Sequence, residues 1–251
     1  MTGGITLYEL VGTTGESRPQ FSHHVWKTKL ALAYLGKSAE SIPLSFHSIR
    51  TELAEKTSNP KVTVPTIVCD EGIITDSWAI AEYLEKKYGA EKSLFSSGKS
   101  FSKFLEQWAL DTLAPELRPL IGPTVYNRID EPSQAYYVQS RVGGDISKMD
   151  AMVAKLSDAS FVAAQTTAAR ARLQLIEDFL TYKKSIGAPL WLGDGVPCHG
   201  DFCVFGWYAF SGVNADATKI WESDSLPLVH EWLEGFFKAG LVKKEDLPTP
   251  V

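Results

Sequence analysis

Two stretches of the sequence are suited to binding a small peptide, and the first is Val64-Pro65. The apolar run 62–68 predicts a buried strand, yet proline lacks the N–H that a central strand needs. A cis Val64-Pro65 bond would explain this proline and would turn the Val64 N–H and C=O outward, free to pair with an extended peptide. An edge strand with a trans proline is the alternative.

The second stretch is Asp76-Ser77, which lies where a helix begins. Trp78, Ala81 and Leu84 mark the apolar side of that helix. A helix start offers free N–H groups and the positive end of the helix dipole, which suit a carboxylate, although such a pair is more often a simple cap. The two stretches together predict a site for a small peptide with a free carboxylate.

The first ninety residues contain the elements that position these groups. A strand is expected over 5–10, a loop over 11–20, a helix from Ser22 to the stop at Gly36, a strand over 41–46 and a helix-like stretch over 47–56. The strand over 62–68, a hairpin return at 73–74 and the helix after Asp76 complete the order β-α-β-α-β-β-α. The first two strands should pair in parallel.

The rest of the chain predicts helices only. Residues 101–113 predict a helix ended by Pro115, and a looser segment should run to about Gly144. A long helix is expected over 161–182 with Phe179 on its buried side, followed by a helix over 202–210 buried all round and a last helix over 229–237. The predicted fold class is therefore α/β plus all-α, with domains at 1–90 and 100–251 and a linker over 91–99.

Composition excludes several classes of partner. The chain has 251 residues, 44% of them apolar, and a formal net charge of −5 with no basic run, which disfavours nucleic acids and anionic membranes. No apolar stretch is long enough for a membrane span and no signal peptide is legible, so we expect a cytoplasmic protein. The three cysteines and five histidines form no metal-binding pattern, and we expect no metal.

Several motifs carry a resemblance to a known family. Asn59-Pro60-Lys61-Val62-Thr63-Val64-Pro65 resembles the Asn-Pro-x-x-x-Val-Pro segment of cytosolic glutathione transferases, and Asp76-Ser77-Trp78-Ala79-Ile80-Ala81 resembles their Glu/Asp-Ser-x-Ala-Ile motif. The resemblance covers essentially the whole chain. It implies an N-terminal thioredoxin-like domain followed by an all-helical domain.

A narrower resemblance is to the etherase-type class, which includes bacterial lignin β-etherases and related transferases of wood-decay fungi. It is carried by the segments 21–32 and 192–197. Two residues depart from the class: His23 replaces the usual proline after Ser22, and Cys198 replaces the Ser or Thr cap three residues before Asp201. The second departure should weaken the capping box and leave Asp201 to act alone.

The resemblance implies that glutathione is the cosubstrate. Val64, next to Pro65, would pair its backbone with the cysteinyl unit, Asp76-Ser77 would hold the γ-glutamyl carboxylate, and Lys61 would reach the glycyl carboxylate. Ser22 would donate a hydrogen bond to the sulfur and favour the thiolate, which is a minor species for a thiol with a pKa of about 8.5. The alternative is that Ser22 is a plain helix cap.

Tyr8 is the rival donor, because other transferase classes use a tyrosine from the first strand. The electrophile pocket should lie between the domains, against the 11–20 loop, with Trp108, Tyr126 and Tyr137 suited to flat phenolic ligands. The resemblance implies an enzyme that adds glutathione to small aromatic electrophiles, with β-aryl ether cleavage as one reaction, and a homodimer. A non-catalytic ligandin that binds aromatic or polyphenolic compounds is the alternative.

Overall fold

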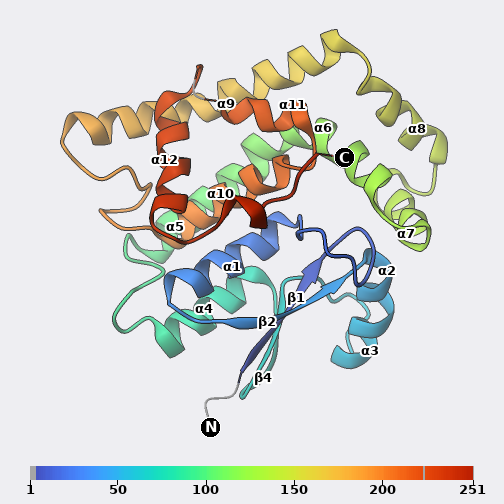
Figure 1. Cartoon of the computed structure of the whole chain (residues 1–251), viewed down its shortest axis with the longest axis horizontal. Coiled ribbons are helices and arrows are strands. Elements are labelled where there is room, and N and C mark those ends of the chain that lie inside the picture. The colour runs from blue at the N-terminus through green and yellow to red at the C-terminus, as the bar shows by residue number, and fades with distance from the viewer. Residues whose placement is uncertain (1–3, 223, 251) are drawn as a thin grey trace.

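The computed structural model describes residues 4–222 and 224–250, so residues 1–3, 223 and 251 of the predicted domains lie outside the described residues. A small sheet with its helices forms the N-terminal part, and helices alone form the rest (Figure 1). The N-terminal elements are β1 (Ile5–Leu10), α1 (His23–Tyr34), β2 (Ala39–Leu44), α2 (Phe46–Ser48), η1 (Ile49–Leu53), α3 (Ala54–Thr57), β3 (Thr66–Cys69), β4 (Gly72–Thr75) and α4 (Ser77–Tyr88). This order confirms the predicted one.

The helical part contains α5 (Lys99–Trp108), η2 (Ala109–Leu113), α6 (Ala114–Arg128), α7 (Glu131–Val142), α8 (Ile146–Lys155), α9 (Ala159–Ser185), α10 (His199–Ser211), α11 (Ala215–Thr218), η3 (Lys219–Trp221), α12 (Pro227–Lys238) and η4 (Lys244–Asp246). None of the described helices is both long and apolar enough to cross a membrane.

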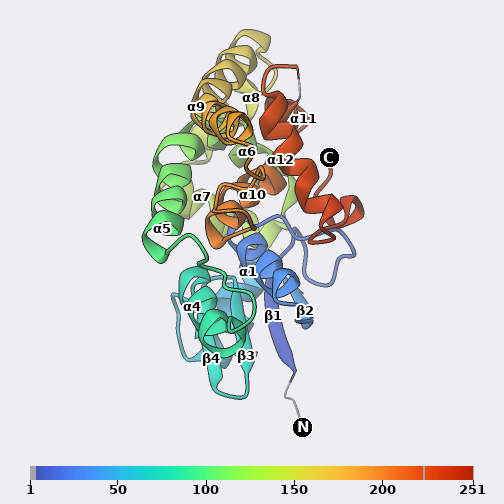
Figure 2. The same cartoon turned by 90° about the vertical axis from the view of Figure 1, so that its left-hand side faces the viewer.

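The sheet has the strand order β2-β1-β3-β4. Strands β1 and β2 pair in parallel, as predicted, while β1–β3 and β3–β4 are antiparallel. Helices α1 and α4 cover one face of the sheet, and α2 and α3 lie on the other (Figures 1 and 2). The starts of α1 and α4 therefore lie on the same side of the sheet, next to the helical part.

The segment after Pro115 is the largest error of the sequence prediction. It is not loose, because α6 and α7 occupy most of it. Pro115 lies in the first turn of α6, where a missing N–H costs nothing, and Pro119 and Pro123 lie inside the helix. These two are four residues apart, so their missing hydrogen bonds fall on the same side of the helix, and packing of α6 against α9 outweighs the loss.

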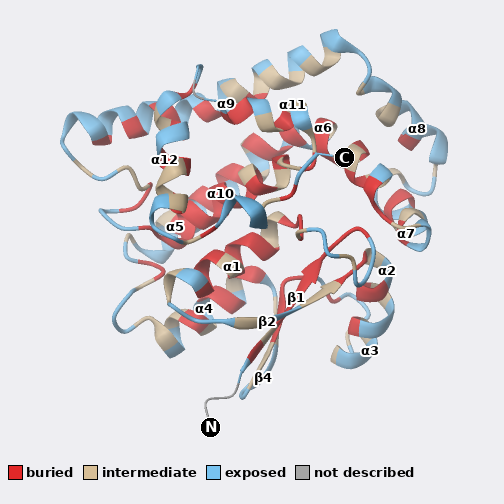
Figure 3. Ribbon diagram, in the orientation of Figure 1, coloured by how far each residue is buried: buried red, intermediate tan, exposed pale blue. Residues whose placement is uncertain are grey.

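The structure also differs from the sequence prediction at the start of one strand, at one helix and at one side chain. The strand predicted over 62–68 begins only at Thr66, and helix α8 was not predicted. Phe179 was placed on the buried side of the long helix, but it is 37% exposed. Helix α10 is buried on nearly every side, as predicted (Figure 3).

The two parts of the molecule meet where α1 packs on α10. A Cβ atom added to Gly206 of α10 would lie 2.5 Å from the carbonyl oxygen of His23, so only glycine allows this close approach. The start of α1 is thus fixed against the helical part.

Candidate functional site

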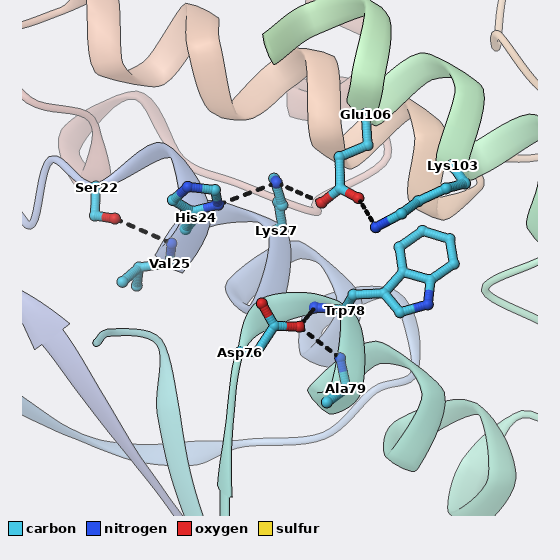
Figure 4. Close-up of polar contacts among 9 residues, drawn as sticks. All are labelled: Ser22, His24, Val25, Lys27, Asp76, Trp78, Ala79, Lys103 and Glu106. Carbon is cyan, nitrogen blue, oxygen red and sulfur yellow. Dashed lines mark hydrogen bonds and ion pairs between the residues drawn. The ribbon is translucent and has the colours of Figure 1, made fainter. Parts of the chain in front are cut away.

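Ser22 is the N-cap of α1 and is buried, with 7% of its surface exposed. Its N–H donates to Gln20 Oε1 at 2.8 Å, and its hydroxyl oxygen accepts a long bond of 3.4 Å from the Val25 N–H (Figure 4). The hydroxyl donates to no other described residue. Ser22 therefore keeps a proton available for a hydrogen bond to a ligand at the positive end of a helix dipole.

His23 follows Ser22 and ties the helix start to α10. Its ring stacks on Trp207 at a centroid distance of 4.1 Å and on Phe210 at 5.4 Å. Burial lowers the pKa of His23 well below its usual value, and the nearby His24 and Lys27 lower it further. The histidine that replaces the family's proline is thus a neutral ring packed between the two parts of the molecule.

Lys27, one turn further along α1, makes a buried ion pair. Its ammonium lies 2.8 Å from Glu106 of α5 and 3.1 Å from His24 Nδ1, while Lys103 also contacts Glu106 at 2.6 Å (Figure 4). Burial alone would raise the pKa of Glu106, but the two lysines outweigh it and lower that pKa to about 2. Burial, followed by the charge of Lys27, lowers the pKa of His24 to about 3.

The Val64-Pro65 bond is cis, which confirms the prediction. Strand β3 begins at Thr66, so Val64 lies beyond the last residue pair of the sheet. The N–H and C=O groups of Val64 form no hydrogen bond with any other described residue. Their pairing with an extended ligand stays a prediction. Arg50 supports this loop by donating to the Val62 carbonyl at 2.7 Å.

Asp76 caps α4 through one carboxylate oxygen. Oδ1 accepts from the N–H groups of Trp78 at 2.9 Å and Ala79 at 3.0 Å (Figure 4). Asp76 has φ 78°, a value that L-residues rarely adopt and that costs about 1–3 kcal/mol where it occurs. The adjacent Ser77 is buried. This backbone strain beside the predicted carboxylate site was not legible in the sequence.

Family models assign both parts of the chain. The model described as "Glutathione S-transferase, N-terminal domain" matches residues 19–92, and the one described as "Glutathione S-transferase, C-terminal domain" matches residues 100–239. The chain belongs to the glutathione S-transferase family. The transferase therefore has the N-terminal thioredoxin-like and C-terminal helical parts that the sequence predicted.

Solved structures share the whole fold of this transferase at low sequence identity. Glutathione transferase GSTFuA3 from Phanerochaete chrysosporium is 18% identical, with a TM-score of 0.76, covering 97% of this chain and 99% of that one. CsGST63524 of Ceriporiopsis subvermispora, solved in complex with glutathione, is 19% identical, with a TM-score of 0.76, covering 96% and 99%.

A curated relative matches over a shorter segment. "Glutathione S-transferase 1" of Manduca sexta is 35% identical over 71 residues, which are 27% of this chain and 33% of that protein. The match thus spans about a third of the relative's length.

The two remaining residues predicted near glutathione differ in their surroundings. Lys61 is exposed, and its side chain forms no ion pair with the described residues. Tyr8 is buried within β1 and lies under the Lys56 ammonium, which is 5.3 Å from the ring centroid. Because Lys56 belongs to α3, the Tyr8 ring faces the α3 side of the sheet, away from the start of α1.

The aromatic residues predicted for the electrophile pocket are mostly covered. Trp108 and Tyr137 are buried and Tyr126 is half-buried. The Tyr137 hydroxyl donates to the Gly122 carbonyl at 3.1 Å. Two hollows, of about 480 Å³ and about 530 Å³, lie instead beside 4–6 and 38–40 and between α9 and η3, and neither includes these three residues.

Lys27 and Glu106 were not found from the sequence. They are separated by 79 positions, and no local pattern marks Lys27 as buried, because α1 also carries His24 and Lys29.

Asp201 was identified from the sequence, but its capping box is not weakened as expected. The Asp201 carboxylate accepts from the Leu192 and Cys198 N–H groups and from the Trp232 indole at 2.7–2.9 Å. The Cys198 side chain also accepts from the Asp201 N–H, so both halves of the capping box are present and Asp201 does not act alone.

Proposed function

We propose that this transferase binds glutathione and adds its thiol to small aromatic or phenolic electrophiles, with Ser22 as the hydrogen-bond donor to the sulfur. The observation that carries this proposal is the Ser22 hydroxyl, which is buried at a helix start, keeps its proton free and accepts only one long bond of 3.4 Å. Such a group can turn toward a thiolate at little cost in helix capping.

The backbone supports one placement of the peptide. The free N–H and C=O of Val64 suit the cysteinyl unit as an added strand. Ser77 and its N–H suit the γ-glutamyl carboxylate, since Asp76 Oδ1 already occupies the next two N–H groups. Asp76 Oδ2 accepts neither of these bonds and would attract the α-ammonium, while the exposed Lys61 would meet the glycyl carboxylate.

Ser22 lowers the thiol pKa by stabilising the anion. Each 1.4 kcal/mol of preference for the thiolate lowers its pKa by about one unit, and a charge-assisted hydrogen bond together with the helix dipole supplies roughly that amount or more. Tyr8 is disfavoured as the donor because its ring faces α3. The serine then acts as a donor to a nucleophile that the cosubstrate carries.

Conjugation of glutathione with 1-chloro-2,4-dinitrobenzene tests the role of Ser22. We expect kcat/KM to fall roughly 10²–10³-fold in Ser22→Ala, as for loss of one oxyanion donor. Ser22→Thr keeps the hydroxyl and should retain most activity, and Tyr8→Phe should remain within a few-fold of the parent. Equal activity of Ser22→Ala and the parent, or a large loss in Tyr8→Phe, would overturn the assignment.

The etherase-like class and a homodimer are further parts of the proposal. They rest on the likeness of the 21–32 and 192–197 segments to that class and on the family. Release of a phenol from a β-aryl ether model compound tests the first, and sedimentation equilibrium tests the second. Tight binding of aromatic compounds with no conjugation of any electrophile would identify a ligandin instead.

A further inference from the structure

An arginine of α6 contacts the same indole as the residue after Ser22. The Arg118 guanidinium carbon lies 5.5 Å from the centroid of the Trp207 ring, on which His23 also stacks at 4.1 Å. Because His23 follows Ser22 directly, Arg118 and the proposed sulfur donor are linked through one side chain of α10. Arg118 is exposed, so a ligand that arrives from solvent can reach it.

A second arginine, on α7, approaches from the neighbouring helix. The Arg141 guanidinium carbon lies 5.3 Å from the centroid of the Tyr137 ring. The Tyr137 hydroxyl bonds the carbonyl of Gly122, which is one turn after Arg118 in α6. Burial, followed by the charge of Arg141, lowers the pKa of Arg118, so the two cations lie near enough to repel each other.

These two charges have no carboxylate at ion-pair distance in the described part of the chain, although the more distant Asp111 favours the charged form of Arg118. Neither arginine forms an ion pair. The nearby carboxylates are engaged elsewhere: Asp111 accepts from Gln107 at 2.6 Å and Glu116 pairs with Arg172 at 2.9 Å. The two like charges repel each other, and an anion bound by both would relieve that repulsion.

The chemistry of arginine defines that anion. A guanidinium packed on an aromatic ring keeps its N–H edges free, and these edges match the paired oxygens of a carboxylate or sulfonate. We propose that Arg118 and Arg141 form the anion-binding end of the electrophile site, so that the transferase prefers aromatic substrates that carry a carboxylate or sulfonate. This inference rests on the proposed function, because it names the substrate class of the same site.

Equilibrium binding of two dyes tests the inference without any catalysis. 8-Anilinonaphthalene-1-sulfonate is an anion, and N-phenyl-1-naphthylamine has the same rings without the charge. We expect the double variant Arg118→Gln/Arg141→Gln to bind the sulfonate about tenfold more weakly or worse, because charge-assisted hydrogen bonds are lost. Its affinity for the amine should change by less than about twofold. The double variant Arg118→Lys/Arg141→Lys, which keeps both charges, should lose less affinity for the sulfonate.

A matched control removes two charges elsewhere. Lys184 and Lys148 take part in exposed ion pairs on α9 and α8, so the double variant Lys184→Gln/Lys148→Gln should bind both dyes as the parent does. If Arg118→Gln/Arg141→Gln and this control weakened sulfonate binding equally, only the net charge of the protein would matter, and the proposal would be overturned. No loss of sulfonate binding in Arg118→Gln/Arg141→Gln, or equal losses for the two dyes, would also overturn it.

Kinetics with 4-chloro-3,5-dinitrobenzoate and its methyl ester separate this inference from the proposed function. In both reactions the glutathione thiolate forms a C–S bond at the ring carbon that carries chlorine, chloride leaves with the bonding electrons, and the thiol proton passes to water. Ser22→Ala should slow both substrates alike if the proposed function holds. Arg118→Gln/Arg141→Gln should raise KM for the benzoate about tenfold and leave the ester unchanged. Equal KM changes for the two substrates would contradict the role of the two arginines and leave the proposed role of Ser22 unaffected.

Discussion

The starts of α1 and α4 lie on the same side of the sheet, yet they are held in different ways. Asp76 caps α4 with two bonds of 2.9 and 3.0 Å from its own helix, whereas Ser22 caps α1 with one bond of 3.4 Å. The start of α1 is fixed instead from the helical part, through the His23 ring on Trp207 and the Lys27–Glu106 ion pair.

Under the proposed function, the α4 start serves binding and the α1 start serves catalysis. The cap of α4 is complete within its own segment, although Trp78 of its first turn also packs on His199 of α10 and under Lys103 of α5. The α1 start leaves the Ser22 hydroxyl nearly free, and its position depends on residues 79 or more positions away. Changes to Trp207, which holds the His23 ring, should therefore act on the Ser22 hydroxyl more than on the cap of α4.

The largest expected effect is loss of the buried ion pair. Glu106→Gln leaves the Lys27 ammonium buried and without its carboxylate, which should lower the free energy of unfolding by about 3–5 kcal/mol. Chemical denaturation measures this. Glu231→Gln, which removes an exposed pair with Lys184, is the control and should change stability by less than about 1 kcal/mol. A similar small change in both variants would show that α1 is not held by the ion pair.

Acid should act on the same contact. The folded-state pKa of Glu106 is lowered to about 2 from 4.5, so its contribution is fully present above pH 4.5 and is lost as the pH falls toward 2. The loss amounts to about 3 kcal/mol. The pKa of His24 is lowered from 6.5 to about 3, so stability should begin to fall below pH 6.5.

Unfolding measured as a function of pH resolves the two groups. His24→Asn should reduce the decline between pH 6.5 and 4.5 without abolishing it, because the pKa values of His23 and His199 are lowered too. Glu106→Gln should reduce the decline below pH 4.5. A decline that neither variant alters would refute this assignment of the acid sensitivity.

A smaller effect is expected at the α4 start. Asp76→Ala removes both capping bonds and should cost about 1–2 kcal/mol, whereas Asp76→Asn keeps an acceptor and should cost less than about 0.5 kcal/mol. Both variants should bind glutathione more weakly by calorimetry, because both remove the charge opposite the ammonium. Unchanged binding in Asp76→Asn would place the ammonium elsewhere.

The smallest expected change is in stability at Ser22. Because its capping bond is long, Ser22→Ala should lower the free energy of unfolding by about 0.5 kcal/mol, the low end of the range for N-caps. Thermal unfolding measures it. A loss of stability above about 2 kcal/mol would mean that Ser22 acts as a structural cap. Lower activity of Ser22→Ala could then not be attributed to a missing hydrogen bond to the sulfur.

The sequence predicted what local patterns determine. The cis Val64-Pro65 bond, the cap at Asp76 and the order of helices and strands along the first ninety residues follow from residues that are neighbours in the chain. The helix through Pro119 and Pro123 could not be predicted, because packing against α9 rather than local propensity stabilises it. The same holds for the Lys27–Glu106 pair and for Arg118 on Trp207, which join distant segments.

Titration of the glutathione thiol while it is bound to the protein, followed by the ultraviolet absorbance of the thiolate, tests the role of Ser22 most directly. We expect a pKa at least one unit below the free value of about 8.5 in the parent and in Tyr8→Phe, and a pKa close to the free value in Ser22→Ala. The same lowered pKa in Ser22→Ala as in the parent, or a pKa near 8.5 in Tyr8→Phe, would mean that Ser22 is not the donor to the sulfur.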